Sequence, residues 1–388
     1  MTQSTSTTGR NAERSRSSNR QAVLGRIQLA GQMGRAEIAR ALGLSTQAVS
    51  NIIAELEHDG LLKEAGTSSG RRGLPAVQYA VNAEGGYALG IEIRPDAIFA
   101  ALVDLHGNPV ATRRRGLKNT KPDRLITKIL KLRGELLEKT GIATYRLLGA
   151  GIVIPGPFGQ TGLSGLGSDL AGWQQIDARA LFEDALGLPI ELSNDANAAA
   201  LSERVAYGAT KGLTNFAYLY FGAGLGLGVV NHGQLVNGAF GNAGEIGHVP
   251  VMTANGPAQL ELQLSRVSVQ NHMQLDVALE IAGIDELYSS ADPKFMTWLD
   301  AGVAALAQAV GLIENLFDPE TIILGGAMPE SVIDHLIEHT ALPDLSVSNR
   351  SDRLHPRLRR GMCGRMTATL GAASLILNRA FTPQTASL

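Results

Sequence analysis

The stretch Ala217–Val249, AYLYFGAGLGLGVVNHGQLVNGAFGNAGEIGHV, decides how the rest of the chain is interpreted. It opens with two apolar β-rich runs, Ala217–Phe221 and Leu225–Val230, separated by Gly222-Ala223-Gly224. This pattern predicts a hairpin, one face of which is almost bare because glycines occupy every second position from 224 to 228. Bare backbone lets a ligand approach closely, but glycines in a strand are equally often bulges or packing contacts, so the spacing leaves both interpretations open.

Two further groups of polar residues indicate a ligand site. Glu245 and His248 lie three residues apart in NAGEIGH, and a carboxylate with an imidazole can hold vicinal hydroxyls. Upstream, Asn194 and Asp195 open a predicted helix at the end of a buried strand. An aspartate there is most often a helix cap. However, open α/β sheets bind ligands at strand ends, and Asp195 is the candidate for taking a proton from a sugar hydroxyl.

Length and composition limit the classes to which the protein can belong. The chain has 388 residues, 44% hydrophobic and 18% charged, which suits two or three globular domains. We find no apolar run near the roughly 20 residues that span a bilayer, and no apolar signal segment at the start. The single cysteine, Cys363, excludes an internal disulfide framework. We therefore expect a cytoplasmic protein with no membrane contact.

The net charge of −2 hides an asymmetry along the chain. Residues 1–82 hold ten Arg/Lys and six Asp/Glu, a net charge of +4, which leaves −6 for the remainder. A basic N-terminal segment followed by an acidic remainder is typical of a DNA-binding head joined to a metabolite-binding domain.

The N-terminal segment predicts a winged helix-turn-helix over residues 20–82. Residues 1–19 are polar, and we expect a flexible basic arm. Three short helices follow, the second over Arg35–Leu42 and the third capped by Ser45. The polar face of the third helix carries Thr46, Gln47, Ser50 and Asn51. Such a face enters the major groove of double-stranded DNA.

A basic wing completes the head. The loop Thr67–Pro75 carries Arg71 and Arg72 between glycines and precedes the strand-like run Val77–Val81. We expect the two arginines to contact phosphates or the adjacent minor groove. Each of these helices alone could be an ordinary amphipathic helix, so the prediction depends on the ordered set. Asn82–Gly86 is the expected boundary to a body over residues 87–388.

The body alternates strands and helices. The predicted strands are Tyr87–Ile93, Ala97–Leu105, Asn108–Arg114, Leu147–Ile154, Pro189–Leu192, Ala217–Phe221, Leu225–Val230 and Thr321–Leu324. The predicted helices are Pro122–Lys139, Ala178–Leu186, Ala196–Val205, Phe295–Leu316 and Pro329–His339. The hairpin at 217–230 repeats the one at 88–104, so we predict an internally duplicated, two-lobed α/β body that binds its ligand between the lobes.

From about Arg20 to Leu377 the chain resembles the ROK family, which contains both sugar kinases and sugar-responsive transcriptional repressors. Six motifs carry the resemblance in family order: LGLSTQAVSNIIAELEHDGLL with the following GRRGLP, GIVIPGP, LSNDANAAALSE, FGAGLGLGVV, NAGEIGH and ILGG. The resemblance implies a two-lobed, actin-like body of the ATPase/hexokinase type. It also implies a sugar site made of Asn194, Asp195 in the catalytic-base position, Glu245, His248 and Glu261.

Three departures from the family pattern favour the repressor branch. The kinases' Asp and Gly-Gly-Thr turn for nucleotide phosphates corresponds to Gly90–Asp96, GIEIRPD, which puts bulk and charge where an open amide nest is needed. Ala223 replaces the threonine of the second phosphate loop. Val249–Glu261 lacks the family's zinc-binding cysteines, so we expect no metal and no cofactor.

The preferred interpretation is a sugar-responsive transcription factor, most simply a repressor, whose body binds a sugar or sugar phosphate without phosphorylating it. We expect a homodimer or dimer of dimers on a pseudo-palindromic operator, because one helix-turn-helix covers only a half-site. The alternatives are an ATP-dependent sugar kinase with an appended DNA-binding head, and a body that binds another protein.

Overall fold

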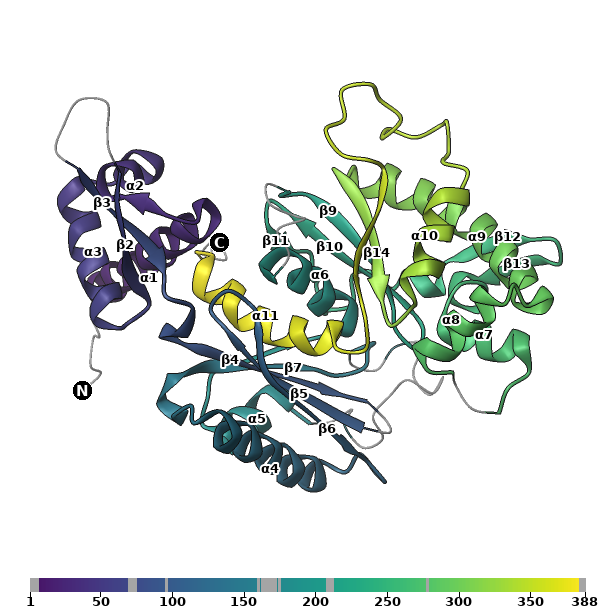
Figure 1. Cartoon of the computed structure of the whole chain (residues 1–388), viewed down its shortest axis with the longest axis horizontal. Helices are drawn as coiled ribbons and strands as arrows, with labels where there is room; N and C mark the ends of the chain where they lie inside the picture. Colours follow the sequence, from purple (N-terminus) through teal and green to yellow (C-terminus); the bar gives the residue numbers. More distant parts are fainter. Residues whose placement is uncertain are drawn as a thin grey trace.

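The computed structural model describes residues 7–68, 75–94, 97–158, 161, 173, 176–206, 213–276 and 279–383. They form a small head and a body of two lobes, and the last helix of the chain reaches from the body to the head (Figure 1). The predicted fold class, a winged helix-turn-helix followed by a two-lobed α/β body, is confirmed.

The head contains three helices and a three-stranded sheet. Its elements are α1 (Thr7–Ala30), β1 (Met33–Gly34), α2 (Arg35–Leu42), α3 (Thr46–His58), β2 (Leu62–Ser68) and β3 (Ala76–Val81), with strand order β1-β3-β2. Val49, Ile53 and Leu56 of α3 are buried, as their helical spacing predicts. The loop that carries Arg71 and Arg72 lies outside the described residues.

Helix α1 begins earlier than the sequence indicated. A flexible arm was expected over residues 1–19, but α1 begins at Thr7, so this expectation is wrong for residues 7–19. Arg16 and Arg20 both form ion pairs with Glu55 of α3, and Arg20 also reaches Asp59 at 2.6 Å. Propagating a helix from an already packed segment costs far less than nucleating one, so polar residues can extend α1 without burying apolar surface.

The first lobe is built on a five-stranded sheet. Its strands are β4 (Tyr87–Ile93), β5 (Ala97–Asp104), β6 (Pro109–Gly116), β7 (Leu147–Val153) and β8 (Ile190–Ser193), in the order β6-β5-β4-β7-β8. Helices α4 (Pro122–Thr140) and α5 (Ala178–Leu186) lie on one face of this sheet (Figure 1). Leu125, Ile129, Leu132 and Leu136 of α4 are buried there at helical spacing.

The second lobe repeats this construction. Its strands are β9 (Phe216–Phe221), β10 (Leu225–Asn231), β11 (Gln234–Leu235), β14 (Thr321–Gly326) and β15 (Leu358–Cys363), in the order β11-β10-β9-β14-β15. In both sheets an antiparallel three-stranded meander gains two parallel strands beside its first strand. The predicted internal duplication is therefore confirmed.

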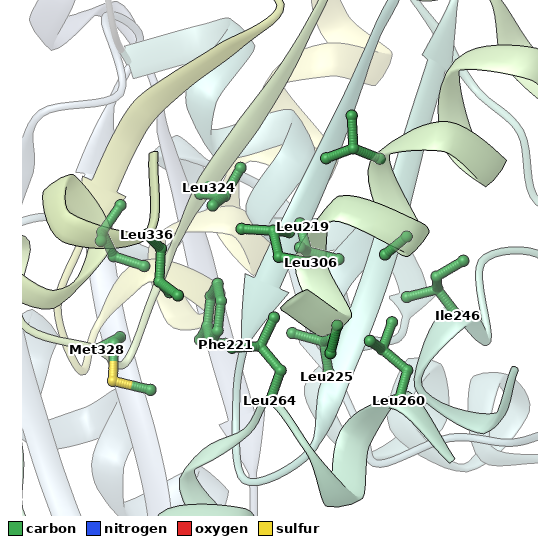
Figure 2. Packing of buried hydrophobic residues seen from close by; sticks show 14 of the residues in the cluster. Leu219, Phe221, Leu225, Ile246, Leu260, Leu264, Leu306, Leu324, Met328 and Leu336 are labelled. Atoms are coloured by element: carbon green, nitrogen blue, oxygen red, sulfur yellow. The ribbon is translucent and has the colours of Figure 1, made fainter. Parts of the chain in front are cut away.

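Helices cover the second sheet. They are α7 (Arg266–Met273), α8 (Ile281–Ser289), α9 (Pro293–Phe317) and α10 (Glu330–His339), accompanied by the hairpin β12 (Pro250–Thr253) and β13 (Gly256–Gln259). Figure 2 shows the core of this lobe, one cluster of buried side chains that includes Leu306 of α9, Leu324 of β14, Ile246 and Leu260.

Among the described residues, α9 is the helix that is long and apolar enough to cross a membrane by length and composition. No such segment was expected from the sequence. Phe295, Trp298, Leu306 and Ile313 of α9 are buried in the core of the second lobe. The buried core helix of a soluble protein can be as long and as apolar as a membrane span. Length and composition are therefore weak evidence for membrane insertion of α9.

Two helices, α6 (Asp195–Ala206) and α11 (Thr367–Phe381), lie between the two sheets (Figure 1). A Cβ atom on Gly371 of α11 would lie 2.2 Å from the carbonyl oxygen of Ala198 in α6, so these helices touch through their backbones. Helix α11 was absent from the sequence-based predictions. It is buried nearly all round, which removes the amphipathic period by which a helix is recognised.

The C-terminal end of α11 joins the head. Val23, Leu24 and Ile27 of α1 belong to one buried cluster with Leu377 and Phe381. Two cavities of about 250 and 330 Å³ lie at this junction, both lined by Leu61 of the head and Leu148 of the body.

Candidate functional site

Asn194 and Asp195 lie where β8 ends and α6 begins, as predicted. Asn194 is buried, and its Oδ1 accepts a hydrogen bond from the backbone N–H of Asn197 at 2.9 Å. The side chain of Asn194 therefore caps α6. Asp195 Oδ1 accepts from the N–H of Ala196 at 2.9 Å, and its Oδ2 lies 3.0 Å from the position of a Cβ on Gly222. Asp195 thus faces the glycine loop of the second lobe.

Glu245, His248 and Glu261 form the opposite side of the same site. His248 Nε2 lies 3.7 Å from Glu245 Oε2, and His248 Nδ1 lies 3.7 Å from Glu261 Oε1. Both distances exceed a hydrogen bond. Among the described residues, His248 Nδ1 is buried and has no hydrogen-bond partner, so the imidazole keeps hydrogen-bonding capacity for a ligand.

Close backbone approaches show that these groups share one site. A Cβ on Gly156, in the loop after β7, would lie 3.2 Å from Glu245 Oε1 and 3.9 Å from Asn194 Cβ. A Cβ on Gly224 would lie 2.6 Å from Glu261 Oε2. The structure therefore brings together all five of the body residues expected to bind a ligand.

The glycines of the β9–β10 hairpin have two different explanations. Gly222 and Gly224 face Asp195 and Glu261, which fits the expected approach of a ligand to bare backbone. Gly226 and Gly228 do not face the candidate ligand site. A Cβ on Gly226 would lie 2.7 Å from Ala196 Cβ, and one on Gly228 2.5 Å from Ala196 O. These two glycines let α6 pack on the hairpin, so packing is the correct reason for this half of the pattern.

The core of the second lobe positions the acidic side chains. Ile246 follows Glu245 and Leu260 precedes Glu261, and both apolar side chains are buried in the cluster shown in Figure 2. Anchoring a neighbouring residue fixes the backbone from which each carboxylate projects.

The two lobes are hydrogen-bonded to each other next to the site. The side-chain oxygen of Asn242 accepts from the N–H of Phe158 at 2.6 Å, and its Nδ2 donates to the carbonyl of Phe158 at 2.9 Å. A rotation of the lobes that separates Asn242 from Phe158 would break this reciprocal pair. Asn242 stands in the NAGEIGH motif but was not singled out from the sequence, since its partner is a backbone group 84 residues away.

Burial shifts the acid–base properties of the site. Desolvation raises the pKa of Asp195 to about 6, and the carboxylate of Glu92 adds to this effect. Desolvation also raises the pKa of Glu245, with a smaller opposing effect of His248. A carboxylate with a pKa near 6 is mostly ionised at neutral pH and is well placed to accept a proton or a hydroxyl hydrogen bond.

Glu92 and Arg94 lie at the end of β4, in the turn that the sequence comparison with the kinases matched to their first phosphate loop. Arg94 Nε donates to Glu92 Oε1 at 2.5 Å, and Thr369 Oγ1 of α11 donates to Glu92 Oε2 at 2.6 Å. Pro95 and Asp96 lie outside the described residues. The described part of this turn therefore carries a buried ion pair anchored to α11.

The candidate DNA-contacting residues lie on one face of α3. Thr46, Gln47 and Asn51 are exposed and Ser50 is half-buried, on the side opposite the apolar residues of the helix. Ser45 caps α3 by accepting from the N–H of Ala48 at 3.1 Å, as predicted. Gln47 donates to Asn51 Oδ1 at 2.9 Å, so the two exposed amides lie together on this face.

Among the described residues, no group of three or more His, Cys, Asp and Glu side chains has an arrangement that could hold a metal ion. Burial raises the pKa of the Cys363 thiol to about 12, so this side chain is a poor thiolate ligand.

Fold and site together define a class: a winged helix-turn-helix head on a duplicated, two-lobed body of the sugar-kinase type. A model of winged helix-turn-helix DNA-binding domains matches residues 16–63, and the ROK family model matches residues 88–379. The chain belongs to the ROK family.

Known proteins resemble this chain over most of its length. The xylose repressor of Bacillus spizizenii is 25% identical over 92% of this chain and 94% of its own. The crystal structure of a ROK family transcriptional regulator, a homologue of the Escherichia coli Mlc protein, superposes with a TM-score of 0.72 at 20% identity, covering 95% of this chain and 97% of that one. A ROK family glucokinase from Streptomyces griseus, crystallised with glucose and AMPPNP, covers 75% of this chain and 99% of its own, with a TM-score of 0.61 at 23% identity.

Proposed function

We propose that this protein is a sugar-responsive transcriptional repressor. Its winged head binds an operator, and a sugar or sugar phosphate bound in the body changes that binding. One observation carries the proposal: Glu245, beside a His248 ring whose Nδ1 has no hydrogen-bond partner among the described residues, lies across Gly156 from Asn194 at the start of α6, and α6 packs on the helix that docks into the head. The full-length similarity to xylose repressors supports it.

The side chains suit a polyhydroxylated ligand. Asp195, Glu245 and Glu261 supply acceptors for sugar hydroxyls, and His248 can donate or accept. Asn194 caps α6, and its remaining amide N–H groups are donors for a ring or hydroxyl oxygen.

The effect of ligand binding in the body can be transmitted to the head through α6 and α11. A ligand that draws Glu245 and Asp195 together acts on both lobes and moves α6 relative to the sheets. For this to switch DNA binding, the sugar must bind one arrangement of the lobes more tightly than the other, because equal affinities shift nothing.

We propose that the protein does not phosphorylate its sugar. Phosphoryl transfer depends on positioning the nucleotide phosphates, and the Glu92–Arg94 pair occupies the turn that would cradle them. The kinase alternative has one specific observation in its favour, the pKa of about 6 of Asp195 in the position of a catalytic base.

The head predicts the form of the assembly. A single helix-turn-helix contacts one half-site, so we propose a homodimer, or a dimer of dimers, on a pseudo-palindromic operator in the cytoplasm. The body is proposed to supply the dimer contact.

Gel-shift titrations of the wild type and of variants of the site, with and without sugars, test the proposal. Glu245→Ala leaves hydroxyls unpaired, at a cost of about 1–3 kcal/mol, or roughly 5- to 150-fold in effector affinity. Both Glu245→Ala and Asp195→Asn should keep operator affinity but lose the response to the sugar. Glu138→Ala, an exposed change on α4, is the matched control and should respond normally.

Three outcomes would contradict the proposal. A normal sugar response in Glu245→Ala and Asp195→Asn would put the effector site elsewhere. Sugar-dependent ATP consumption by the wild type would move the protein to the kinases. If no sugar alters operator binding, a protein partner becomes the better explanation.

A further inference from the structure

Large apolar side chains are exposed together on the second lobe. Seven of the fifteen large apolar residues that are exposed in the described part of the chain lie between residues 312 and 354. They are Leu312, Leu316, Phe317, Leu342, Leu345, Val347 and Leu354. Single exposed apolar residues are normal on a protein surface, whereas a concentrated group of them marks an interaction site.

These side chains lie on two segments that contact each other: the end of α9, and residues 340–357, which connect α10 to β15. The Oδ1 of Asn315 in α9 accepts from the N–H of Val347 at 3.1 Å. A Cβ on Gly311, one turn earlier in α9, would lie 3.4 Å from Pro343 Cγ. The exposed side chains beside these contacts form one surface, which we call the apolar face: Leu312, Leu316, Leu342, Leu345 and Val347.

Polar contacts, not the leucines, hold the connecting segment in place. Glu314 of α9 is buried and accepts two hydrogen bonds from Arg357, of 2.6 and 2.7 Å. The same carboxylate accepts from the hydroxyl of Ser346 at 2.5 Å. Leu345 is 93% exposed, so its side chain contributes almost no packing to this arrangement. The segment is thus ordered with leucines in solvent, and such preorganisation lowers the entropy cost of binding a partner.

Charges of both signs are interspersed around the apolar face. The arginines of the connecting segment and the carboxylates that act on them are Arg350, Arg353 and Arg357, with Glu314, Asp318, Asp344 and Asp352. Arg350 and Asp352 are also joined by hydrogen bonds of 2.6 and 2.8 Å. These two segments therefore carry no excess of basic residues that would fit nucleic acid. An apolar centre with a polar rim is the composition of a homodimer interface.

We propose that the apolar face binds the same face of a second copy of this chain and is the dimer contact of the body. The inference rests on the proposed function, in which two heads occupy one pseudo-palindromic operator. In a two-fold contact the same patch is used by both copies, and a patch without a large excess of either charge can meet its own copy without repulsion.

The position of the apolar face suits this contact. Figure 1 shows residues 340–357, in yellow-green, projecting from the second lobe on the side away from the first lobe. The apolar face shares no residue with α3 or with the candidate ligand site. Pairing through it therefore occupies neither the DNA-contacting residues nor the residues proposed to hold the sugar.

Sedimentation velocity of the full chain without DNA tests the contact. The wild type should sediment as a dimer, or as a dimer of dimers. Leu316→Glu with Leu345→Glu brings like charges together in the contact and should weaken assembly by roughly 100-fold or more. Both side chains are mostly in solvent within one chain, so the variant should stay folded. Val110→Glu, at an exposed apolar position of β6 in the first lobe, is the matched control and should assemble as wild type.

A mixture of variants with opposite charges separates a direct contact from a folding defect. Leu316→Lys with Leu345→Lys should also fail to assemble on its own. Mixed in equal amounts with the glutamate variant, it should restore the dimer, because opposite charges then face each other across the two-fold axis. A folding defect in either variant would not be repaired by mixing.

The outcomes separate this inference from the proposed function. A glutamate variant that assembles as well as the wild type overturns the assignment to the apolar face, and so does a mixture that stays dissociated. A monomeric wild type overturns the contact between copies and makes a different protein the better occupant of this face. None of these results removes a sugar response measured in gel shifts with the wild type. Failure of every sugar to alter operator binding overturns the proposed function itself, whatever the state of assembly.

Discussion

Gly25 in α1 of the head lies against the backbone of Phe381 at the end of α11: a Cβ on Gly25 would stand 2.0 Å from the Phe381 carbonyl oxygen. Gln21, one turn earlier, donates to the carbonyl of Arg379 at 2.9 Å. The head is thus in backbone contact with the helix that also packs on α6. The orientation of the head therefore depends on a helix that belongs to the body.

Gly25→Ala should disturb this junction. The methyl group meets backbone that cannot rotate away, and overpacking of this kind costs about 1–3 kcal/mol. We expect a lower urea midpoint and a weaker effect of sugar on operator binding. Gly134→Ala is the matched control, because Gly134 is also helical and a Cβ there meets nothing within 4 Å. That variant should be more stable by about 0.5–1 kcal/mol. Equal midpoints for the two variants would contradict close docking of α1 on α11.

Asp195→Asn should change the pH dependence of stability. The pKa of Asp195 is about 6 in the folded state, against an ordinary value of 3.8 for an aspartate. Between these values the native state holds a proton that the unfolded state has released, so the free energy of unfolding falls as pH rises and stays low above pH 6. The asparagine variant should lack this decline.

Urea unfolding at pH 4 and at pH 7.5 checks this expectation. Asp195→Asn should be more stable than wild type at pH 7.5, on the order of 1–3 kcal/mol, and the gain should shrink toward pH 4. Asp184→Asn, on the exposed face of α5, controls for the loss of a carboxylate. A stability difference between Asp195→Asn and wild type that stays constant with pH would contradict a raised pKa at Asp195.

The residues of the candidate site could be proposed from local motifs, whereas their long-range partners could not. Asp195, Glu245, His248 and Glu261 each stand in a motif with characteristic neighbours, and the structure places them together. Thr369 donates a hydrogen bond to Glu92, which lies 277 residues earlier in the chain. The sequence around either residue gives no indication of its partner.

The fold shows the same division. Strands with alternating or continuous apolar runs were predicted to within a residue or two, because their signal lies within a few positions. Helix α11 was missed because it is made of small and apolar residues buried on nearly all sides.

The wing arginines predict a specific salt dependence. Replacing Arg71 and Arg72 together by Ala should weaken operator binding and reduce the log–log salt slope by roughly one unit for each phosphate that the wing no longer neutralises. Arg124→Ala with Lys131→Ala removes the same charge from α4 and should leave the slope unchanged. Filter-binding measurements over a range of salt concentrations decide the question. An unchanged slope in the wing variant would remove the wing from the interface.

The last prediction concerns the route from the sugar to the head. Arg204 of α6 donates to Asn378 Oδ1 of α11 at 2.5 Å, and Thr382 donates to the same oxygen at 3.1 Å. This hydrogen bond ties the helix that begins at Asp195 to the end of α11 that contacts α1. Asn378→Ala removes the tie without touching either ligand site, so sugar affinity in the absence of DNA and operator affinity in the absence of sugar should both stay near wild type.

What should change in Asn378→Ala is the coupling between the two ligands. Coupling free energies between sites are commonly about 1–3 kcal/mol, and they are reciprocal. The variant should therefore show a smaller effect of sugar on operator affinity, and an equally smaller effect of operator DNA on sugar affinity. Anisotropy titrations of each ligand at saturating amounts of the other measure both sides. Asn255→Ala, at the exposed tip of the β12–β13 hairpin, is the control. Full coupling in Asn378→Ala would mean that the sugar acts on the head by a route other than this contact between α6 and α11.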